Sequence, residues 1–307
     1  MESSSRRRQS IAVIGAGGVG GRIAAALALE GWHDVVVCAR RSLDEIVFEP
    51  ADAMVRLPVR TCVDPAAASP VDWVMLCTKA QDTPSAAAWL AALCHRGTHV
   101  AVCQNGIGHA GRVAPFIGPA TAVPVVVYFN GERVGPHHVR FRHVGERDLA
   151  VPDDAGGAAL ARLLAGTCLR TFVSADFVTL QWRKLLINAV ANPVTALTRQ
   201  RLAVFAHADI RALCMDILDE AVAVGRACGA AFANDEGATV LAALLALAPN
   251  LGTSMYADTL RDGVLEVDAL TGAIVEAGEA HGIPTPVNRT LLALLRAISD
   301  GARARQV

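Results

Sequence analysis

The hydrophobic positions follow different patterns in the two halves of the chain. In the first half, short apolar runs alternate with glycine-containing turns and helical segments, a pattern typical of buried parallel strands. We predict a helix over residues 86–93 and strands over residues 11–14, 35–38, 73–78, 100–103 and 121–128. Alternating strands and helices indicate a doubly wound parallel sheet with helices on both faces.

From about Phe177 onward the strand pattern disappears and apolar residues recur at helical spacing. We predict helices over residues 182–197, 208–228, 236–247, 254–260, 264–281 and 288–298. The expected fold class is therefore an α/β N-terminal Rossmann-like doubly wound domain, residues 1–176, plus an all-α C-terminal domain, residues 177–307.

Composition narrows the class of protein further. Apolar residues make up 53% of the 307 residues and charged residues 19%, which indicates a chain with large buried cores. A formal charge of −1 gives no electrostatic case for nucleic acid or an anionic membrane surface. The uncharged stretch 238–257 has the length of a membrane span, but its apolar part stops at Pro249, so we predict a buried helix and a turn.

The eight cysteines are scattered, with no pair at metal-binding spacing. They are typical of free thiols in a reducing compartment, so we expect a cytoplasmic protein without a structural metal.

A glycine-rich loop follows the first predicted strand and precedes a predicted helix. Its residues are Gly15, Ala16, Gly17, Gly18, Val19 and Gly20. In the pattern GxGxxG, Gly15 permits the tight turn, Gly17 lets the backbone approach a pyrophosphate, and Gly20 lets helix and strand pack closely. The pyrophosphate would sit at the N-terminus of the helix, where free N–H groups point at it.

Three polar residues follow later strands, at the edge where doubly wound sheets bind ligands. Arg40 follows the second strand, at a place where an NAD site has an acidic residue and an arginine instead accommodates a 2′-phosphate. Lys79 follows the third strand and could reach a phosphate; Asn105 follows the fourth and could touch the nicotinamide. The expected cofactor is NADP(H), although each of these residues could instead belong to a solvated loop or turn.

The predicted helix 182–197 is almost wholly apolar, apart from Lys184, Asn188 and Asn192. These residues are four apart and therefore lie on one face. A lysine flanked by two amides can donate a proton to a substrate oxygen. The same stripe could instead be a solvated edge, or the amides could satisfy a kink at Pro193.

Ser254 and Glu266 each fall near the start of a predicted helix. Alone, Ser254 could be a helix cap, and Glu266 could simply favour the helix dipole.

Several motifs together resemble the ketopantoate reductase (2-dehydropantoate 2-reductase) family, and they cover nearly the whole chain. They are GAGGVGG, TKAQDT, QNGIG, WRKLLINAVANPVTAL and TSMYADTLRDGVLEVD. The lysine helix and the serine-to-glutamate segment are the more specific, since many enzymes share the glycine loop. Members of the family reduce a 2-keto acid with NADPH, using a Rossmann domain and a helical domain.

The resemblance implies a role for each polar residue of the second half. Lys184 would donate the proton, Asn188 and Asn192 would hold the hydroxyl and keto end of the substrate, and Ser254 would hold its carboxylate. Glu266 would orient the reacting groups and the cofactor ribose.

In the first half, the resemblance makes Asn105 a bridge between cofactor and substrate, and it assigns Arg40 and Lys79 to the 2′-phosphate. The chain also departs from the family. Leu202 and Ala203 stand where members often have an Asn-Gly pair whose asparagine contacts substrate. We therefore expect a preference shifted towards 2-keto acids with a less polar distal group.

The function predicted from the sequence is NADPH-dependent reduction of a 2-keto acid, 2-dehydropantoate or a close analogue. Two alternatives stay open: a non-catalytic NADP(H)-binding redox sensor, and a reductase of the same fold that acts on a different carbonyl substrate. The expected partner is a small-molecule 2-keto acid rather than nucleic acid or membrane, and the assembly is a monomer or a homodimer.

Overall fold

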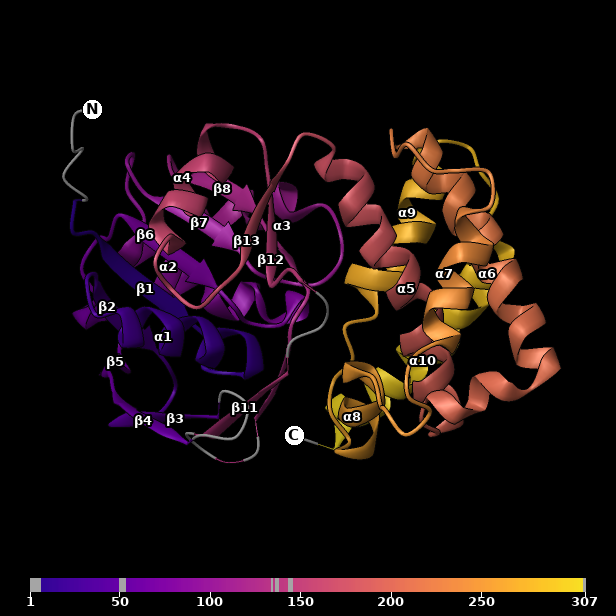
Figure 1. Ribbon diagram of the computed structural model, residues 1–307, viewed down its shortest axis with the longest axis horizontal. Helices are drawn as coiled ribbons and strands as arrows, with labels where there is room; N and C mark the ends of the chain where they lie inside the picture. The colour runs from indigo at the N-terminus through magenta and orange to yellow at the C-terminus, as the bar shows by residue number, and fades with distance from the viewer. Residues whose placement is uncertain (1–6, 50–53, 134, 136–137, 143–145, 306–307) are drawn as a thin grey trace. The chain divides into compact units, whose positions relative to one another are not determined.

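In this computed structural model the described residues are 7–49, 54–133, 135, 138–142 and 146–305. The chain forms two compact units (Figure 1). Unit 1 comprises residues 1–104 and 108–177, and unit 2 comprises residues 105–107 and 178–307. The short segment 105–107 thus belongs to a different unit from the residues on either side of it.

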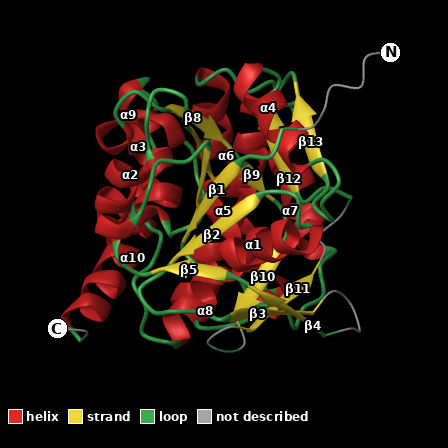
Figure 2. Ribbon diagram, turned by 90° about the vertical axis from the view of Figure 1, so that its left-hand side faces the viewer, coloured by secondary structure: helices red, strands yellow, loops and turns green. Residues whose placement is uncertain are grey.

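The centre of unit 1 is a six-stranded parallel sheet in the order β5-β2-β1-β6-β7-β8. Its strands are β1 Ser10–Ile14, β2 Asp34–Cys38, β5 Arg60–Cys62, β6 Trp73–Leu76, β7 His99–Val102 and β8 Thr121–Pro124. Figure 2 shows β5, β2 and β1 of this sheet side by side. The order reverses direction at β1, which begins the chain in the middle of the sheet, as in doubly wound folds.

Side chains alternate across the sheet, so each strand serves two cores. Ile11 and Val13 point into a core shared with helices α1 (Gly18–Glu30) and α4 (Ala155–Leu164). Their neighbours Ala12 and Ile14 point into the opposite core, which contains buried residues of α2 (Ala87–Leu93) and α3 (His109–Ile117). Burial on both faces explains why these strands are continuously apolar, and it confirms the predicted α/β fold of this half.

The two smaller sheets of unit 1 as such, and its helix α4, were not predicted. One sheet has the order β10-β11-β3-β4 and the other β13-β12-β9. Their strands are β3 Glu45–Glu49, β4 Val55–Pro58, β9 Val126–Val127, β10 Asn130–Arg133, β11 His138–Arg142, β12 Leu149–Pro152 and β13 Thr171–Ser174. The single strand predicted over residues 121–128 is wrong, because β8 pairs with β7 in the main sheet whereas β9 pairs with β12.

Polar and apolar residues alternate over residues 137–144, which predicts an antiparallel edge strand. The described residues 138–142 do form a strand, β11, that is antiparallel to its neighbour β10, but it lies inside its sheet and not at the edge.

Short 3₁₀ turns link the larger elements. They are η1 Pro65–Ala67, η2 Ala80–Asp82, η3 Pro84–Ala86 and, in unit 2, η4 Leu202–Ala206.

The described residues of unit 2 form helices joined by turns and contain no strand, as predicted for this half. Its helices are α5 Phe177–Thr198, whose first residue lies in unit 1, α6 Ala208–Ala227, α7 Glu236–Leu245, α8 Ser254–Leu260, α9 Ala273–Ala280 and α10 Pro286–Ala304. The helix predicted over residues 264–281 begins late, because a π-helical turn, η5 Asp268–Gly272, precedes α9. Such π-turns are rare and occur often at functional sites.

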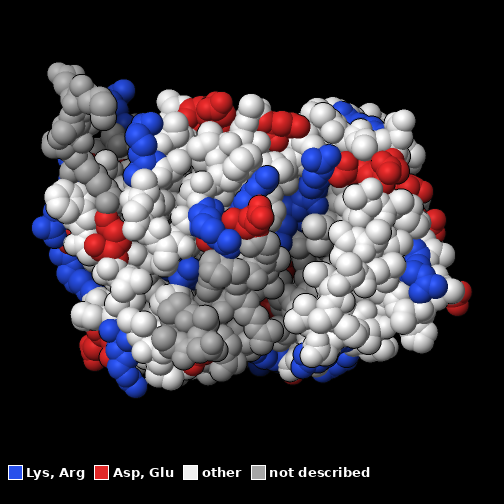
Figure 3. Space-filling model, viewed as in Figure 1, with Lys and Arg blue, Asp and Glu red and all other residues white. Residues whose placement is uncertain are grey.

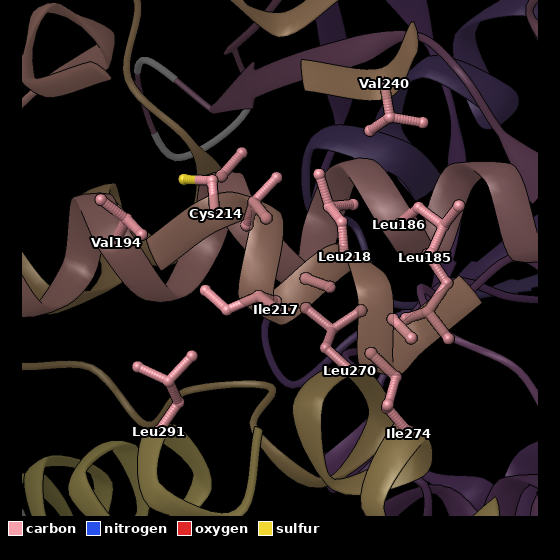
Figure 4. Close-up of a cluster of buried hydrophobic side chains, with 14 of the residues drawn as sticks. Leu185, Leu186, Val194, Cys214, Ile217, Leu218, Val240, Leu270, Ile274 and Leu291 are labelled. Carbon is pink, nitrogen blue, oxygen red and sulfur yellow. The ribbon is translucent and has the colours of Figure 1, made fainter. Parts of the chain in front are cut away.

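Helix α5 is apolar on most of its circumference because other helices of unit 2 surround it. Leu185, Leu186 and Val194 lie in one core with Ile217 of α6 and Ile274 of α9 (Figure 4). A helix enclosed in this way needs no wide polar face, so the few polar residues it keeps need another explanation.

Helix α7 was predicted to be buried, and this is wrong for half of its surface. Val240, Leu241 and Leu244 face the core, whereas Ala242 and Leu245 are exposed. A helix that packs on one side of a core buries only one stripe. In the part of the chain that the structure describes, no helix has both the length and the apolar character needed to cross a membrane.

Candidate functional site

The glycine loop of unit 1 contains positions with different steric demands. Gly15 has φ +96°, a left-handed conformation that favours glycine, and a Cβ on Gly20 would overlap the carbonyl oxygen of Gly15. These two glycines are therefore required by the fold of the loop itself. A Cβ on Gly17, by contrast, would meet no atom within 4 Å, so the space in front of Gly17 is free for a ligand.

Gly18 has a role that the sequence did not reveal. A Cβ on Gly18 would overlap the carbonyl oxygen of Gly131 in β10, so the helix N-terminus and this strand approach closely. The contact requires glycine at both positions, and nothing in the spacing GxGxxG distinguishes Gly18 from its neighbours. Ala16 and Val19 pack partly against the core beneath the loop.

The two candidate phosphate ligands lie where the sequence placed them along the sheet. Arg40 follows β2 and is exposed. Lys79 follows β6 and is half-buried at the start of η2. Both therefore follow the carboxyl ends of parallel strands, the edge at which ligands bind such sheets. On the face shown in Figure 3, basic and acidic side chains are interspersed, as expected for a formal charge of −1.

A buried polar network connects the loops that follow β6 and β7. Gln104 Nε2 donates to Thr78 Oγ1 at 3.1 Å and to Thr83 Oγ1 at 3.0 Å, and Gln104 Oε1 accepts from Arg112 Nη1 at 3.1 Å. His109 Nε2 lies 2.9 Å from the Gln104 carbonyl oxygen. Since a carbonyl only accepts, the neutral ring carries its proton on Nε2. Sequence reasoning missed this network, although its residues flank Lys79 and Asn105.

Burial and, to a smaller extent, the nearby Arg112 guanidinium lower the pKa of His109 to about 4, against the opposing effect of the bond to the Gln104 carbonyl. The imidazole is therefore neutral above about pH 5 and keeps its bond to the loop.

In unit 2, the stripe predicted on one face of α5 consists of Lys184, Asn188 and Asn192. Burial lowers the pKa of the Lys184 ammonium below its ordinary value. The buried Asn188 Nδ2 has no hydrogen-bond partner among the described residues. A stripe with these properties is no solvated edge, because water would satisfy the amide and leave the lysine at its usual pKa.

Asn192 is buried and connects the stripe to helix α8. Its Oδ1 accepts from Ser254 Oγ at 3.5 Å and from Met255 N at 3.4 Å. The α8 N-cap is Thr253, whose Oγ1 accepts from Tyr256 N at 3.1 Å. Ser254 is exposed and is not the cap, so the capping interpretation of Ser254 is wrong.

Glu266 is 8% exposed and accepts from Asn105 Nδ2 at 3.1 Å. Both residues belong to unit 2, although Asn105 was predicted as a residue of the first domain. The next helical turn starts at Asp268, so Glu266 precedes it. A carboxylate buried against an amide does more than favour a helix dipole, because exposed side chains suffice for that.

The structure thus brings together two predicted pairs, Asn105 with Glu266 and Asn192 with Ser254. Unit 2 contains a lysine of lowered pKa on the same helix face as Asn188 and Asn192, and separately a buried carboxylate bonded to an amide. These residue types suit proton transfer to an oxygen of a polar ligand. Among the described residues no group of three or more His, Cys, Asp or Glu side chains could hold a metal ion.

A doubly wound sheet with a glycine loop, followed in the chain by a helical unit that carries a lysine of lowered pKa, is typical of a dinucleotide-dependent oxidoreductase. The chain belongs to the ketopantoate reductase family. The protein-family model for Ketopantoate reductase PanE/ApbA matches residues 11–154. The family model for Ketopantoate reductase PanE/ApbA C terminal matches residues 176–299.

Individual relatives agree over nearly full length. The 2-dehydropantoate 2-reductase of Caulobacter vibrioides is 40% identical over 94% of this chain and 98% of its own. The structure of a PanE/ApbA family ketopantoate reductase from Ralstonia eutropha has a TM-score of 0.86 and 31% identity, covering 96% of this chain and 99% of that one. The dimeric ketopantoate reductase of Staphylococcus aureus has a TM-score of 0.85 and 26% identity, covering 95% and 99%.

Proposed function

We propose that this chain uses NADPH to reduce 2-dehydropantoate, or a close analogue, to the 2-hydroxy acid, the step that forms pantoate in pantothenate biosynthesis. The observation that carries the proposal is the stripe on α5. Lys184 has a pKa lowered by burial, and two turns further on Asn192 bonds to Ser254. Family membership and full-length likeness to 2-dehydropantoate 2-reductases support it.

The cofactor would be held by residues 1–176, the dinucleotide-binding domain of this proposal. The fit is steric: Gly15 and Gly20 shape the loop, while the open space at Gly17 suits a pyrophosphate. Arg40 and Lys79 would bind the 2′-phosphate that distinguishes NADPH from NADH. When bound, the cofactor supplies a hydride to C2 of the keto acid.

Residues 177–307, the substrate and catalytic domain of this proposal, would act on the keto acid. Ser254 holds the carboxylate, and Asn188 and Asn192 hold the keto and hydroxyl oxygens. The Asn188 Nδ2 that lacks a partner among the described residues is suited to donate to such an oxygen.

Lys184 stabilises the oxygen at C2 as negative charge develops there, and then gives it a proton. Burial makes the ammonium a stronger acid than an exposed lysine, and a stronger acid transfers its proton more readily at neutral pH. Glu266, bonded to Asn105, orients the reacting groups.

The far end of the substrate is where this chain would differ from its family. The Leu202 side chain lies in the apolar core of unit 2, and its N–H donates to Leu251 O at 2.9 Å. It therefore offers no side-chain hydrogen bond where members often have an asparagine, which supports a preference shifted towards a less polar distal group.

The test is NADPH oxidation by the purified protein with ketopantoate and with a 2-keto acid of similar bulk that lacks the terminal hydroxyl. Turnover of 2-keto acids is the expected result. Tight NADPH binding without turnover of any 2-keto acid would favour the redox sensor. A ketopantoate advantage of about a hundredfold or more in kcat/KM would show that the hydroxyl is still specifically held, contrary to the Leu202 argument.

We place this activity in the cytoplasm, with a small-molecule substrate as its partner. The dimeric relative from Staphylococcus aureus makes a homodimer the first assembly to test, by light scattering of the purified protein.

A further inference from the structure

The chain passes from unit 1 into unit 2 and back within a few residues. Gln104 belongs to unit 1, residues 105–107 belong to unit 2, and Gly108 belongs to unit 1 again. Such a crossing is unusual for a loop that simply connects a strand to the next helix of its own domain. The contacts at its base and at its tip show how it is fixed.

The base of the loop is fastened inside unit 1. Gln104 forms side-chain hydrogen bonds with Thr78, Thr83 and Arg112, and its carbonyl oxygen accepts from His109 Nε2 at 2.9 Å. The hydrogen bond from His109 to the Gln104 carbonyl therefore joins the two ends of the loop, one residue before Asn105 and one residue after Gly108. Because Gln104 and His109 are both buried, these bonds are shielded from water and fix the two ends of the loop in unit 1.

The tip of the loop is fastened inside unit 2. Asn105 Nδ2 donates to Glu266 Oε2 at 3.1 Å, and Ile107 packs against the apolar core of unit 2. Gly106 has φ +91°, and a Cβ there would overlap the backbone carbonyl oxygen of Ala269. The middle of the tip thus makes a backbone-to-backbone contact that only glycine permits.

Ala269, the residue that Gly106 contacts, lies in a π-helical turn. This π-turn is Asp268–Gly272, in which Gly272 N donates to Val267 O at 2.9 Å, a span of five residues. A π-turn inserts one extra residue and displaces the local backbone. Glu266 lies immediately before this turn, so the contact at Ala269 and the bond from Asn105 fix the same segment.

We propose that residues 105–107 are a positioning element, in which Gly106 docks on the π-turn and holds the Asn105–Glu266 pair in its reactive geometry. Gly106 acts through these two residues and is not itself a catalytic residue. The inference rests on the proposed function for its catalytic consequence, but the docking itself does not depend on it.

The test compares Gly106→Ala with Gly108→Ala. Both glycines have positive φ, +91° and +71°, so alanine strains the backbone at either position. A Cβ on Gly108 meets no atom within 4 Å, so only Gly106→Ala disturbs the docking. We expect Gly106→Ala to lower kcat about a hundredfold, the effect of a misplaced reacting group. We expect Gly108→Ala to keep the wild-type kcat.

A second readout is amide hydrogen exchange of the peptide covering residues 266–272, which needs no turnover. It should become faster in Gly106→Ala and not in Gly108→Ala. If Gly106→Ala fails to fold, Ile107→Ala, which removes the apolar anchor without backbone strain, should change kcat and exchange in the same direction. Equal effects of the two glycine variants, or unchanged exchange in Gly106→Ala, would overturn the proposal. If the wild type reduces no 2-keto acid, the proposed function is wrong, but the hydrogen-exchange comparison still tests whether Gly106 docks on the π-turn.

Discussion

The two units present their chemistry in different ways. In unit 1 the candidate cofactor site is built mainly from backbone: Gly15 and Gly20 shape a turn and Gly17 leaves open space. In unit 2 the candidate substrate site is built from side chains of separate elements, such as Asn192 on α5 and Ser254 on α8. A backbone site depends on which positions lack a Cβ, whereas a side-chain site depends on how helices pack.

This difference decides what a substitution does. In the glycine loop, adding one carbon can block a ligand or break the fold, depending on the position. On the α5 stripe, removal of the Lys184 side chain is expected to abolish the proposed reaction while the buried face of the helix, and hence the fold, is preserved. The predictions below test this contrast, beginning with the largest expected effect.

Gly20→Ala should destabilise the protein by about 3 kcal/mol, the upper end of the usual range for overpacking, because the new Cβ would overlap the backbone of Gly15. Gly17→Ala should leave the melting temperature unchanged and weaken NADPH binding by about 1.5–3 kcal/mol, the range for losing a hydrogen bond to a charged group. Thermal unfolding and fluorescence titration measure the two effects. Equal stability of both variants would contradict the claim that Gly20 is required by the fold and Gly17 by the ligand.

His109 should make the stability of the protein depend on pH. Its folded pKa is about 4, below the ordinary value of 6.5, so the unfolded chain binds the proton more readily. Stability should therefore fall as pH falls from about 6.5 to 4, by up to about 3 kcal/mol. Urea unfolding at several pH values should show this loss in wild type and a smaller one in His109→Gln. His207→Gln, at an exposed histidine, is the control and should behave like wild type.

Arg40→Ala should reduce the preference for NADPH over NADH by about 1.5–3 kcal/mol, through loss of a charged hydrogen bond to the 2′-phosphate. The measurement is kcat/KM for both cofactors. Arg41→Ala, at the exposed neighbour, is the matched control and should change the preference less. Equal efficiency with both cofactors in wild type would show that Arg40 is an ordinary surface residue.

Local sequence was sufficient for the parts of the molecule that depend on local rules. The strands of the main sheet other than its edge strand β5, their alternation with helices, and the helical second half follow from hydrophobic periodicity and turn residues. The stripe on α5 could be predicted because residues four apart share a helix face whatever surrounds the helix. The smaller sheets were missed because strands such as β3 and β4 are short and their pairing is decided by tertiary contacts.

Other features have no local signature. Gly18 looks like any loop glycine until β10 is placed against it. In the sequence Gln104 resembles an ordinary turn residue, because its hydrogen-bond partners Thr78 and Arg112 become its neighbours only in the folded chain. The assignment of residues 105–107 to unit 2 depends on a contact with the distant Ala269, which spacing along the chain cannot show.

The central claim is that Lys184 is the proton donor of a reductase, and one comparison tests it most directly: kcat and NADPH affinity in wild type and Lys184→Ala. The account predicts that kcat falls about 10²–10⁴-fold while NADPH still binds with wild-type affinity. It also predicts that kcat of the wild type falls as pH rises through the lowered pKa of Lys184, because a general acid must be protonated. A variant that keeps more than about a tenth of the wild-type kcat would contradict the claim, since general-acid catalysis is normally worth far more.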